Sequence, residues 1–389
     1  MKAVMYGGGN IGRGFIGALF SKSGFEVTFI DVSDKVVDTL NRDHRYPLRY
    51  VSDGGHTDEW IENVSAVNGN DTDAVARAIA ECDIMATAVG ARILPYIAPN
   101  IAKGIELRKS PLNILICENL MDADKVLRGL VKDALGYEPQ NVGFIETSIG
   151  RMVPVQTEEM QDGEPLRVCV EKYGFLPVDK SAFIGDIPDI KGMVPFSPFD
   201  FYIKRKLFLH NMGHAVCAYL GKLSGYEYIA QAISDPEIYI TVQNAMLDSA
   251  RALSKEYGVD LNDILPHVSD LLYRFKNPAL RDTCERVGAD PVRKLGAADR
   301  LIGASLLQQK HGIMPVYTAI GAAGALMCYD EVKNGNDAKK ALFDIAGLKE
   351  DDKLSKLIIE LYNMMKCGAT VQEVKTVAEV TRQMDIEII

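Results

Sequence analysis

The sequence predicts two domains: an N-terminal α/β domain with a doubly wound parallel sheet, and a mainly α-helical C-terminal domain. Strand-like apolar segments alternate with helical segments as far as residue 146, which is the pattern of a parallel sheet covered by helices. A glycine-rich turn joins the first strand to the first helix. Beyond residue 195 the apolar residues follow helical spacing. We therefore expect one domain over residues 1–195 and a second over 196–389.

The glycine-rich turn has the pattern GxGxxG and stands between a strand at 3–6 and a helix at 13–20. In such a turn Gly7 allows the sharp bend, Gly9 lets a pyrophosphate approach the backbone, and Gly12 lets the helix pack closely on the strand. The N-terminus of the helix then offers free N–H groups to the phosphates. The pattern alone is a weak signal, because glycine-rich turns are common.

An acidic residue strengthens the interpretation. A second strand at 25–30 ends in Asp31, which stands 19 residues after Gly12. A carboxylate at this place binds the ribose hydroxyls of a dinucleotide. It also repels a 2′-phosphate, so NAD is favoured over NADP. The alternative role for Asp31 is to cap a helix that begins near Ser33. With the glycines, the pattern is typical of a Rossmann-type NAD-binding domain.

The alternation continues through helices expected at 72–81, 93–104 and 121–135 and strands expected at 83–89, 112–117 and 142–146. Ligands bind beyond the carboxyl ends of such strands, which places residues 89–90 and 118–119 beside the cofactor. Asn119 is a candidate hydrogen-bond donor to the substrate, with a cap for the helix at 121–135 as the alternative. The residues that we expect to bind the cofactor are Gly7, Gly8, Gly9, Asn10, Ile11, Gly12, Asp31, Val89 and Gly90.

Two regions interrupt the simple alternation. Residues 48–52 and 64–68 resemble short strands around the turn at 53–55, and we expect an inserted hairpin in which the sole tryptophan, Trp60, is packed. Residues 150–195 are rich in proline and glycine and contain a strand-like segment at 166–170. They lead to the second domain.

The most informative stretch of the second domain runs from Lys206 to His214 and includes Asn211. In an α-helix these residues fall at about 0° (Lys206), 80° (His214) and 140° (Asn211), so one face presents an amine, an imidazole and a carboxamide. These are the groups that turn a hydroxyl into a carbonyl: a base, a partner that tunes it, and a donor for the developing oxyanion. The alternative is a solvated helix face. We expect the three to line a cleft between the domains.

Helices are expected in the second domain at 202–222, 226–232, 235–257, 261–275, 297–309, 314–329, 338–346, 352–366 and 371–384. A segment between these helices places three cations within eight residues. Arginine suits a phosphate because its donors form a fork. The alternative is a solvated helix start in which Asp299 is a cap or ion partner. The candidate substrate-binding cations are Arg151, Arg293, Lys294 and Arg300.

Composition limits the partners. The net charge of −10 argues against nucleic acid and against an anionic membrane surface, although a local basic pocket can still bind a phosphate. The seven cysteines form no CxxC pair, which favours buried reduced thiols in a cytoplasmic protein. The cysteines and histidines show no zinc-site spacing, so no metal is expected. We also expect neither a signal peptide nor a membrane-spanning segment. Monomer and dimer both remain open.

These motifs together resemble the polyol-specific long-chain dehydrogenase/reductase family, which includes the mannitol dehydrogenases. The resemblance rests on the sequence GGGNIGRGFIG at 7–17 and on Lys206-x4-Asn211-x2-His214, and it extends over residues 1–330. Further similar stretches lie at 110–114, 117–119, 205–208, 213–215, 218–223, 274–278 and 285–288. The fold expected from the resemblance agrees with the one that the periodicity predicts.

The resemblance implies a metal-independent, NAD-linked interconversion of D-mannitol 1-phosphate and D-fructose 6-phosphate. By it, Lys206 is the general base, Asn119 and Asn211 stabilise the oxyanion, and His214 orients the substrate or tunes the lysine. It also suggests that the cations of 293–300 bind the phosphate or the polyol hydroxyls. Burial should lower the pKa of Lys206, because an ordinary lysine is a poor base near neutrality.

Two departures from the family pattern bear on the substrate. Gly150 stands where many members carry aspartate, and Glu118 stands where several relatives have aspartate. An unphosphorylated substrate, free mannitol or a ketose derived from a hexuronate (fructuronate or tagaturonate type), is therefore the alternative within the family. Outside it, a nucleotide-sensing binding protein with a vestigial site is the alternative.

Overall fold

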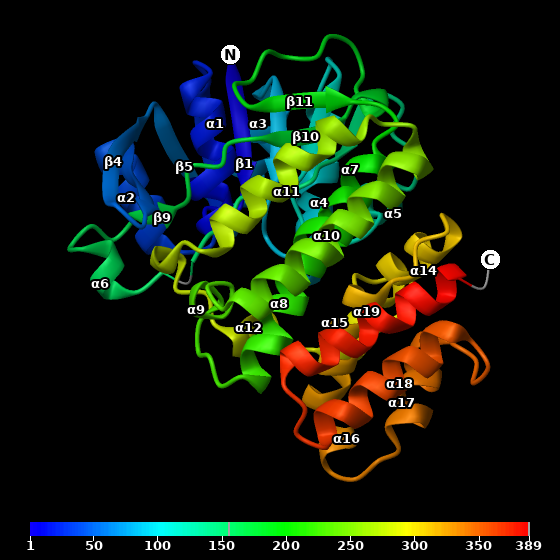
Figure 1. Ribbon diagram of the computed structural model, residues 1–389. Helices are drawn as coiled ribbons and strands as arrows, with labels where there is room; N and C mark the ends of the chain where they lie inside the picture. Colours follow the sequence, from blue (N-terminus) through cyan, green and yellow to red (C-terminus); the bar gives the residue numbers. More distant parts are fainter. Residues whose placement is uncertain (155, 388–389) are drawn as a thin grey trace. The chain divides into compact units, whose positions relative to one another are not determined.

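The computed structural model describes residues 1–154 and 156–387, and the chain forms two compact units, Met1–Asp200 and Phe201–Ile389 (Figure 1). The first unit contains the predicted parallel sheet and the second is mostly helical, so both parts of the predicted fold class are confirmed. Within the described ranges, no helix combines the length and the apolar character needed to cross a membrane.

The sheet of the first unit has six parallel strands in the order β5-β2-β1-β6-β7-β8. The strands are β1 (Lys2–Tyr6), β2 (Glu26–Asp31), β5 (Val64–Asn68), β6 (Ile84–Thr87), β7 (Leu112–Ile116) and β8 (Val142–Glu146). The first strands are added to one side of β1 and the later strands to its other side, beginning with β6. The gap between β1 and β6 is therefore the topological switch point, where doubly wound sheets bind ligands. The helices between strands are α1 (Gly17–Lys22), α2 (Asp34–Asp43), α3 (Thr72–Glu81), α4 (Leu94–Leu107) and α5 (Ala123–Leu135).

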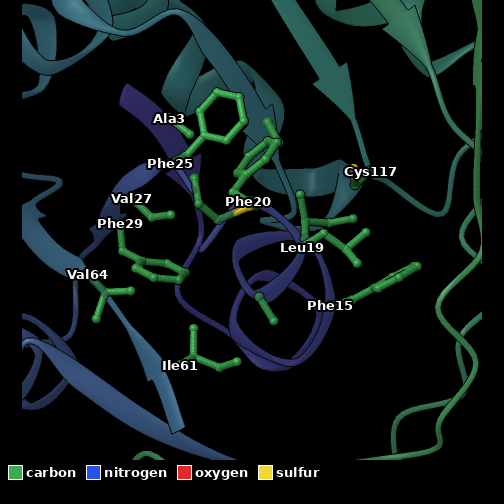
Figure 2. Close-up of a cluster of buried hydrophobic side chains, with 14 of the residues drawn as sticks. Ala3, Phe15, Leu19, Phe20, Phe25, Val27, Phe29, Ile61, Val64 and Cys117 are labelled. Atoms are coloured by element: carbon green, nitrogen blue, oxygen red, sulfur yellow. The ribbon is translucent and has the colours of Figure 1, made fainter. Parts of the chain in front are cut away.

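Alternate residues of β1 enter two cores, one on each face of the sheet. Ala3 and Met5 belong to one apolar cluster, and Val4 and Tyr6 to the other. Figure 2 shows the first cluster, where Phe20 of the first helix lies beside Phe25, the residue that precedes β2. Burial on both faces explains why these strands read as continuous apolar runs.

The inserted hairpin is present, but one of its strands differs from the prediction. β3 (Arg45–Ser52) pairs antiparallel with β4 (Gly55–Glu62), whereas Val64–Asn68 pairs parallel with β2 as the edge of the main sheet. Most of β4 is polar and exposed, so no apolar alternation marks it. The expected packing of Trp60 is also wrong: it is 45% exposed, with the Arg45 guanidinium 4.5 Å from its ring centroid.

The proline- and glycine-rich region completes the first unit with short elements. The predicted strand at 166–170 is present as β9 (Val168–Val170), which joins β3 in a three-stranded sheet. A parallel pair that the sequence did not predict follows, formed by β10 (Leu176–Asp179) and β11 (Met193–Phe196). The remaining short elements are α6 (Glu158–Gln161) and the 3₁₀ turns η2 (Ala91–Ile93) and η3 (Lys180–Ala182).

The second unit is built around α15 (Val316–Cys328), which is buried along nearly its whole length and contacts α8 and α18. One continuous helical run comprises α7 (Asp200–Arg205), the π-helical segment η4 (Lys206–Asn211) and α8 (Met212–Leu223). The other helices are α9 (Ile229–Ala232), α10 (Pro236–Tyr257), α11 (Leu261–Phe275), the 3₁₀ turn η5 (Pro278–Leu280), α12 (Cys284–Val287), α13 (Pro291–Lys294), α14 (Ile302–Lys310), α16 (Asp330–Lys333), α17 (Ala338–Ala346), α18 (Lys353–Lys366) and α19 (Val371–Glu387). The predicted long helices are present, and the short α12 and α13 were not predicted.

Candidate active site

The glycines of the glycine-rich turn have two roles: some allow close packing of the backbone, and one leaves space for a ligand. A Cβ on Gly7 would lie 2.5 Å from the Ala88 carbonyl oxygen, and a Cβ on Gly12 would lie 1.9 Å from the Gly7 carbonyl oxygen. These two positions therefore admit only glycine. A Cβ on Gly9 would meet no atom within 4 Å, so this glycine leaves the backbone open to a ligand. The helix that follows has π-type hydrogen bonding over η1 (Gly12–Ile16), a feature often seen at functional sites.

Asp31 is oriented by the turn that it faces. Its Oδ2 accepts a 2.8 Å hydrogen bond from the Gly8 N–H, and its Oδ1 accepts one of 2.9 Å from the Ser33 N–H. The N-cap residue of α2 is Ser33, so Asp31 is not the cap. Carboxylate oxygens have two lone-pair sites each, and both oxygens of Asp31 therefore keep capacity for hydroxyl groups.

Arg13 fastens the turn from its buried side, a role that the sequence did not indicate. Its Nε donates a 2.5 Å hydrogen bond to the Gly8 carbonyl, and its Nη1 donates to the Leu166 carbonyl. The Tyr46 hydroxyl donates a 2.7 Å bond to the Arg13 carbonyl. Burial lowers the pKa of Arg13. These bonds tie the turn to the proline- and glycine-rich region.

Glu118 accepts hydrogen bonds from the backbone of Val89 and Gly90, the two residues that were expected beside the cofactor. Its buried carboxylate accepts 2.9 Å and 2.8 Å hydrogen bonds from the N–H groups of Val89 and Gly90. These donors are therefore unavailable to a ligand, whereas the space beside Gly90 is open. Glu118 thus joins the carboxyl ends of the neighbouring strands β6 and β7, of which β6 borders the switch point.

Asn119 follows Glu118 and is exposed. The N-cap residue of α5 is Asp122, so the alternative role of Asn119 as the helix cap is wrong. Among residues 1–154 and 156–387, no hydrogen bond is made by the Asn119 side chain. Its amide is therefore available to a ligand.

The segment from Lys206 to Asn211 is a π-helix, where an uninterrupted α-helix was expected. The Met212 N–H donates to the Leu207 carbonyl, five residues earlier, in place of the α-helical partner four residues earlier. This pairing winds the chain less per residue. Lys206 and Asn211, five residues apart, therefore lie closer to one face than the predicted 140° separation. The segment contacts α10, α11 and α14.

Lys206 is a partly buried lysine that makes no ion pair or hydrogen bond with any residue that the structure describes. Burial, and next the positive charge of Arg300, lower its pKa to about 8. An amine with such a pKa is neutral in an appreciable fraction of molecules near neutrality. It can therefore act as a general base.

His214 lies against an aromatic ring and an acid that the sequence did not single out. Its imidazole stacks on Phe275, with ring centroids 4.9 Å apart and planes at 11°. Its Nε2 lies 3.1 Å from Oδ2 of Asp282. His210 lies nearby, and its pKa is well below the usual value, first because of burial and then because of Arg274, so it is neutral.

The three cations at 293–300 differ in exposure: one is exposed, one is buried, and Arg300 is intermediate, with 13% of its side chain exposed. Arg293 is half exposed, and its Nε donates a 2.8 Å hydrogen bond to Asp290, which caps α13. The solvated helix start thus describes Arg293, with Asp290 rather than Asp299 as the cap, and Asp299 is the ion partner of Arg300. Lys294 is 4% exposed, and its pKa falls to about 8 through burial and then the charges of Arg300 and Arg293. Arg300 binds Asp299 through Nε at 2.7 Å.

Arg151 has backbone partners within the first unit. Its Nη1 donates a 2.8 Å hydrogen bond to the Gly14 carbonyl, and its Nε donates to the Tyr173 carbonyl. The guanidinium also stacks on Phe15, 4.5 Å from the ring centroid. Tyr173 limits Gly150 as well, because a Cβ there would lie 3.0 Å from the Tyr173 ring. Contact of Arg151 with substrate stays a prediction.

In the described parts of the chain, no three His, Cys, Asp or Glu side chains lie close enough together to bind a metal ion. The seven cysteines are free thiols, six of them buried and Cys367 exposed. Burial raises the pKa of Cys117 to about 12, so this thiol is not a nucleophile.

Comparison with known proteins assigns the family. Residues 1–192 match the mannitol dehydrogenase Rossmann domain, and residues 199–383 match the mannitol dehydrogenase C-terminal domain. Among solved structures, the chain is similar to a substrate-free D-sorbitol dehydrogenase, with 16% identity, 96% of this chain and 94% of the other covered, and a TM-score of 0.80. It is also similar to mannitol 2-dehydrogenase of Pseudomonas fluorescens, a ternary complex with NAD and D-mannitol, with 15% identity, 97% and 94% coverage, and a TM-score of 0.73. At these identities the structures show a shared fold, and the two domain matches show that this protein belongs to the mannitol dehydrogenase family.

Proposed function

We propose that this protein is an NAD-dependent polyol-phosphate dehydrogenase that interconverts D-mannitol 1-phosphate and D-fructose 6-phosphate. Membership of the mannitol dehydrogenase family supports an oxidoreductase acting on a polyol. The observation that carries the finer proposal is Lys206, which has no partner among residues 1–154 and 156–387 and whose pKa burial and the charge of Arg300 lower to about 8. Arg300 also lowers the pKa of Lys294, so three cations influence one region of an acidic protein.

The turn and Asp31 fit NAD. The open backbone at Gly9 suits a pyrophosphate, and the fixed carboxylate of Asp31 suits two ribose hydroxyls. A 2′-phosphate would bring negative charge to that carboxylate, which disfavours NADP. The family's Rossmann domain, and the relative solved with NAD, support the same cofactor. Bound NAD supplies the hydride acceptor for polyol oxidation.

The proton transfer falls to Lys206. Its neutral amine takes the proton of the reacting hydroxyl, and its ammonium returns a proton to the carbonyl oxygen when the ketose is reduced. As the hydroxyl loses its proton, negative charge develops on its oxygen. The amide groups of Asn211 and Asn119 donate hydrogen bonds to that oxygen, which stabilises the transition state more than the ground state. His214 orients the substrate.

The grouped cations favour a phosphorylated substrate over its unphosphorylated analogue. Asp299 binds Arg300, and the charges of Asp290 and Asp299 both act on Lys294, whereas Lys206 has no ion pair among the described residues. Burying positive charge without full compensation is costly, and the lowered pKa values of both lysines reflect that cost. A phosphate dianion relieves it. Lys294 and Arg300 are therefore the proposed phosphate ligands, and Arg293 is their matched control.

A substrate panel followed through NADH absorbance tests the proposal. We expect the highest kcat/KM with D-fructose 6-phosphate, compared with D-fructose and ketoses derived from hexuronates. Lys294→Ala and Arg300→Gln should raise KM for the phosphorylated sugar much more than for D-fructose, whereas Arg293→Ala should change neither by more than about twofold. A higher kcat/KM with an unphosphorylated ketose would refute the phosphate assignment. NADH binding without turnover of any sugar would favour the nucleotide-sensing alternative.

A further inference from the structure

The loop that carries Asp282 is held in place by backbone bonds to a distant part of the second unit. The Ile229 N–H donates a 2.9 Å bond to the Asp282 carbonyl, and Tyr228 and Thr283 form an isolated antiparallel bridge. Thr283 caps α12 directly after Asp282, and its side chain accepts from the Arg286 N–H. The position of the Asp282 side chain is therefore set by the fold.

The two carboxylate oxygens of Asp282 have different partners. Oδ1 accepts a 2.9 Å bond from Nε of Arg286 and a second bond from Nη2 of the same side chain. Oδ2 lies 3.1 Å from Nε2 of His214. The Asp282 side chain is only 10% exposed, and burial by itself would raise its pKa. His214 and Arg286 outweigh that effect and hold the pKa below its usual value, so the group is a carboxylate.

The imidazole of His214 has one buried and one open nitrogen. Nε2 is buried and lies 3.1 Å from Oδ2 of Asp282, and it makes no hydrogen bond with any other group in the described part of the chain. Nδ1 is not among the buried unpartnered atoms of the described residues. The parallel stack on Phe275 restrains rotation of the ring, which keeps Nε2 toward the acid.

We propose that Asp282 is a positioning residue that sets the tautomer of the uncharged form of His214 to Nε2–H, with Nδ1 left as a hydrogen-bond acceptor for a substrate hydroxyl. This inference rests on the proposed function, since it specifies how one residue of that site meets a polyol. An N–H that faces a carboxylate is retained, because the alternative tautomer would set a lone pair against a negative charge. A nitrogen acceptor suits a polyol, whose hydroxyl groups are donors, and it does not compete with Lys206 for the proton-transfer role.

Nuclear magnetic resonance of the intact protein reads the tautomer directly. With ¹⁵N-labelled histidine, the two ring nitrogens of His214 are distinguished by their chemical shifts in alkaline solution, and His214→Gln identifies its signals among the six histidines. We expect the Nε2–H form in the unaltered protein. Asp282→Asn should shift the population toward Nδ1–H, and Arg286→Gln, the matched control, should leave the Nε2–H form in place because the carboxylate remains.

Kinetics add a second readout. Asp282→Asn should lower kcat by about 10–100-fold, the range known for partners that orient a functional histidine in metal sites, while NADH binding stays unchanged. Asp282→Glu should recover part of the loss. A Nδ1–H form in the unaltered protein overturns the inference even if no Asp282 variant folds, and a fully active Asp282→Asn enzyme overturns it as well. A Nε2–H form in a protein that turns over no sugar would instead refute the proposed function.

Discussion

Removal of the Lys206 amine should abolish proton transfer without disturbing NADH binding. At pH 7 a group with the pKa of about 8 found for Lys206 is neutral in about a tenth of molecules, whereas the ordinary value of 10.5 leaves about 3 in 10,000 neutral. The environment thus increases the population of active base by roughly 300-fold. Lys206→Ala should lose the roughly 10²–10⁴-fold that a general acid–base group contributes.

The assay is a pH–rate profile of kcat/KM in both directions. Polyol oxidation should rise with pH to a plateau above an apparent pKa of about 8, because the base must be neutral. Ketose reduction should fall over the same range, because it needs the ammonium. Lys206→Ala should lose the steep limb, and small primary amines should restore part of its rate. The matched control is Lys204→Ala, which removes a lysine two residues earlier whose Nζ lies 5.2 Å from the Phe208 ring centroid.

A second variant tests the cause of the lowered pKa. Arg300 lowers the pKa of Lys206 by charge, so Arg300→Gln should move the oxidation limb to higher pH, while burial keeps it below the ordinary lysine value. His214→Ala should cost less than Lys206→Ala, and it should leave the limb in place. Near-normal turnover and an unchanged pH profile in Lys206→Ala would refute the reasoning and make His214 the next candidate base.

Other expectations concern stability, cofactor choice and the switch point. The pKa of Lys206 is lower in the folded protein than in the unfolded chain, so the unfolded chain binds its proton more tightly and the charged amine destabilises the folded state. This destabilisation is fully present below about pH 8 and disappears as the pH approaches 10.5. Lys206→Met should therefore raise the free energy of unfolding by about 1–3 kcal/mol at pH 7 and by less at pH 10, as measured by urea denaturation; an equal gain at both values would contradict this. Asp31→Ala should bring kcat/KM with NADP closer to that with NAD, and comparable efficiencies in the unaltered enzyme would oppose the assignment of Asp31. Glu118→Gln should leave one of the N–H groups of Val89 and Gly90 unpaired and weaken NADH binding about tenfold in a fluorescence titration, whereas unchanged affinity would separate this clamp from the cofactor.

Local sequence patterns were sufficient for the glycine-rich turn and for five strands of the main sheet, whereas β5 was assigned to the inserted hairpin. Each predicted strand of the main sheet is a short apolar run bounded by turn residues, and burial on both faces requires that composition. Gly7 and Gly12 could be interpreted from spacing, because a Cβ at either would collide with backbone within the same local motif. Asp31 could be placed for a similar reason, since the residue that ends β2 lies beside the turn that ends β1.

The partners of the candidate catalytic residues come from distant parts of the sequence, and the tertiary structure decided them. Asp282 reaches His214 because the loop after η5 packs against α8, and no spacing relates the two residues. The separation of Lys294 from the exposed Arg293 depends on how α13 is buried. Glu118 was predicted to lie near the cofactor, but its two hydrogen bonds depend on the alignment of β6 with β7.

The sequence by itself thus determined the fold class, and it predicted the nucleotide-binding turn and the chemical roles of Lys206, Asn211 and His214. The tertiary structure alone decided that Lys206–Asn211 winds as a π-helix, since the same residues are compatible with an α-helix and differ only in which carbonyl each N–H reaches. It also decided the pKa of Lys206, because burial and the charge of Arg300 arise from segments that contact the π-helix after the chain has folded. Propensity and spacing act over a few residues, whereas desolvation and charge act through space.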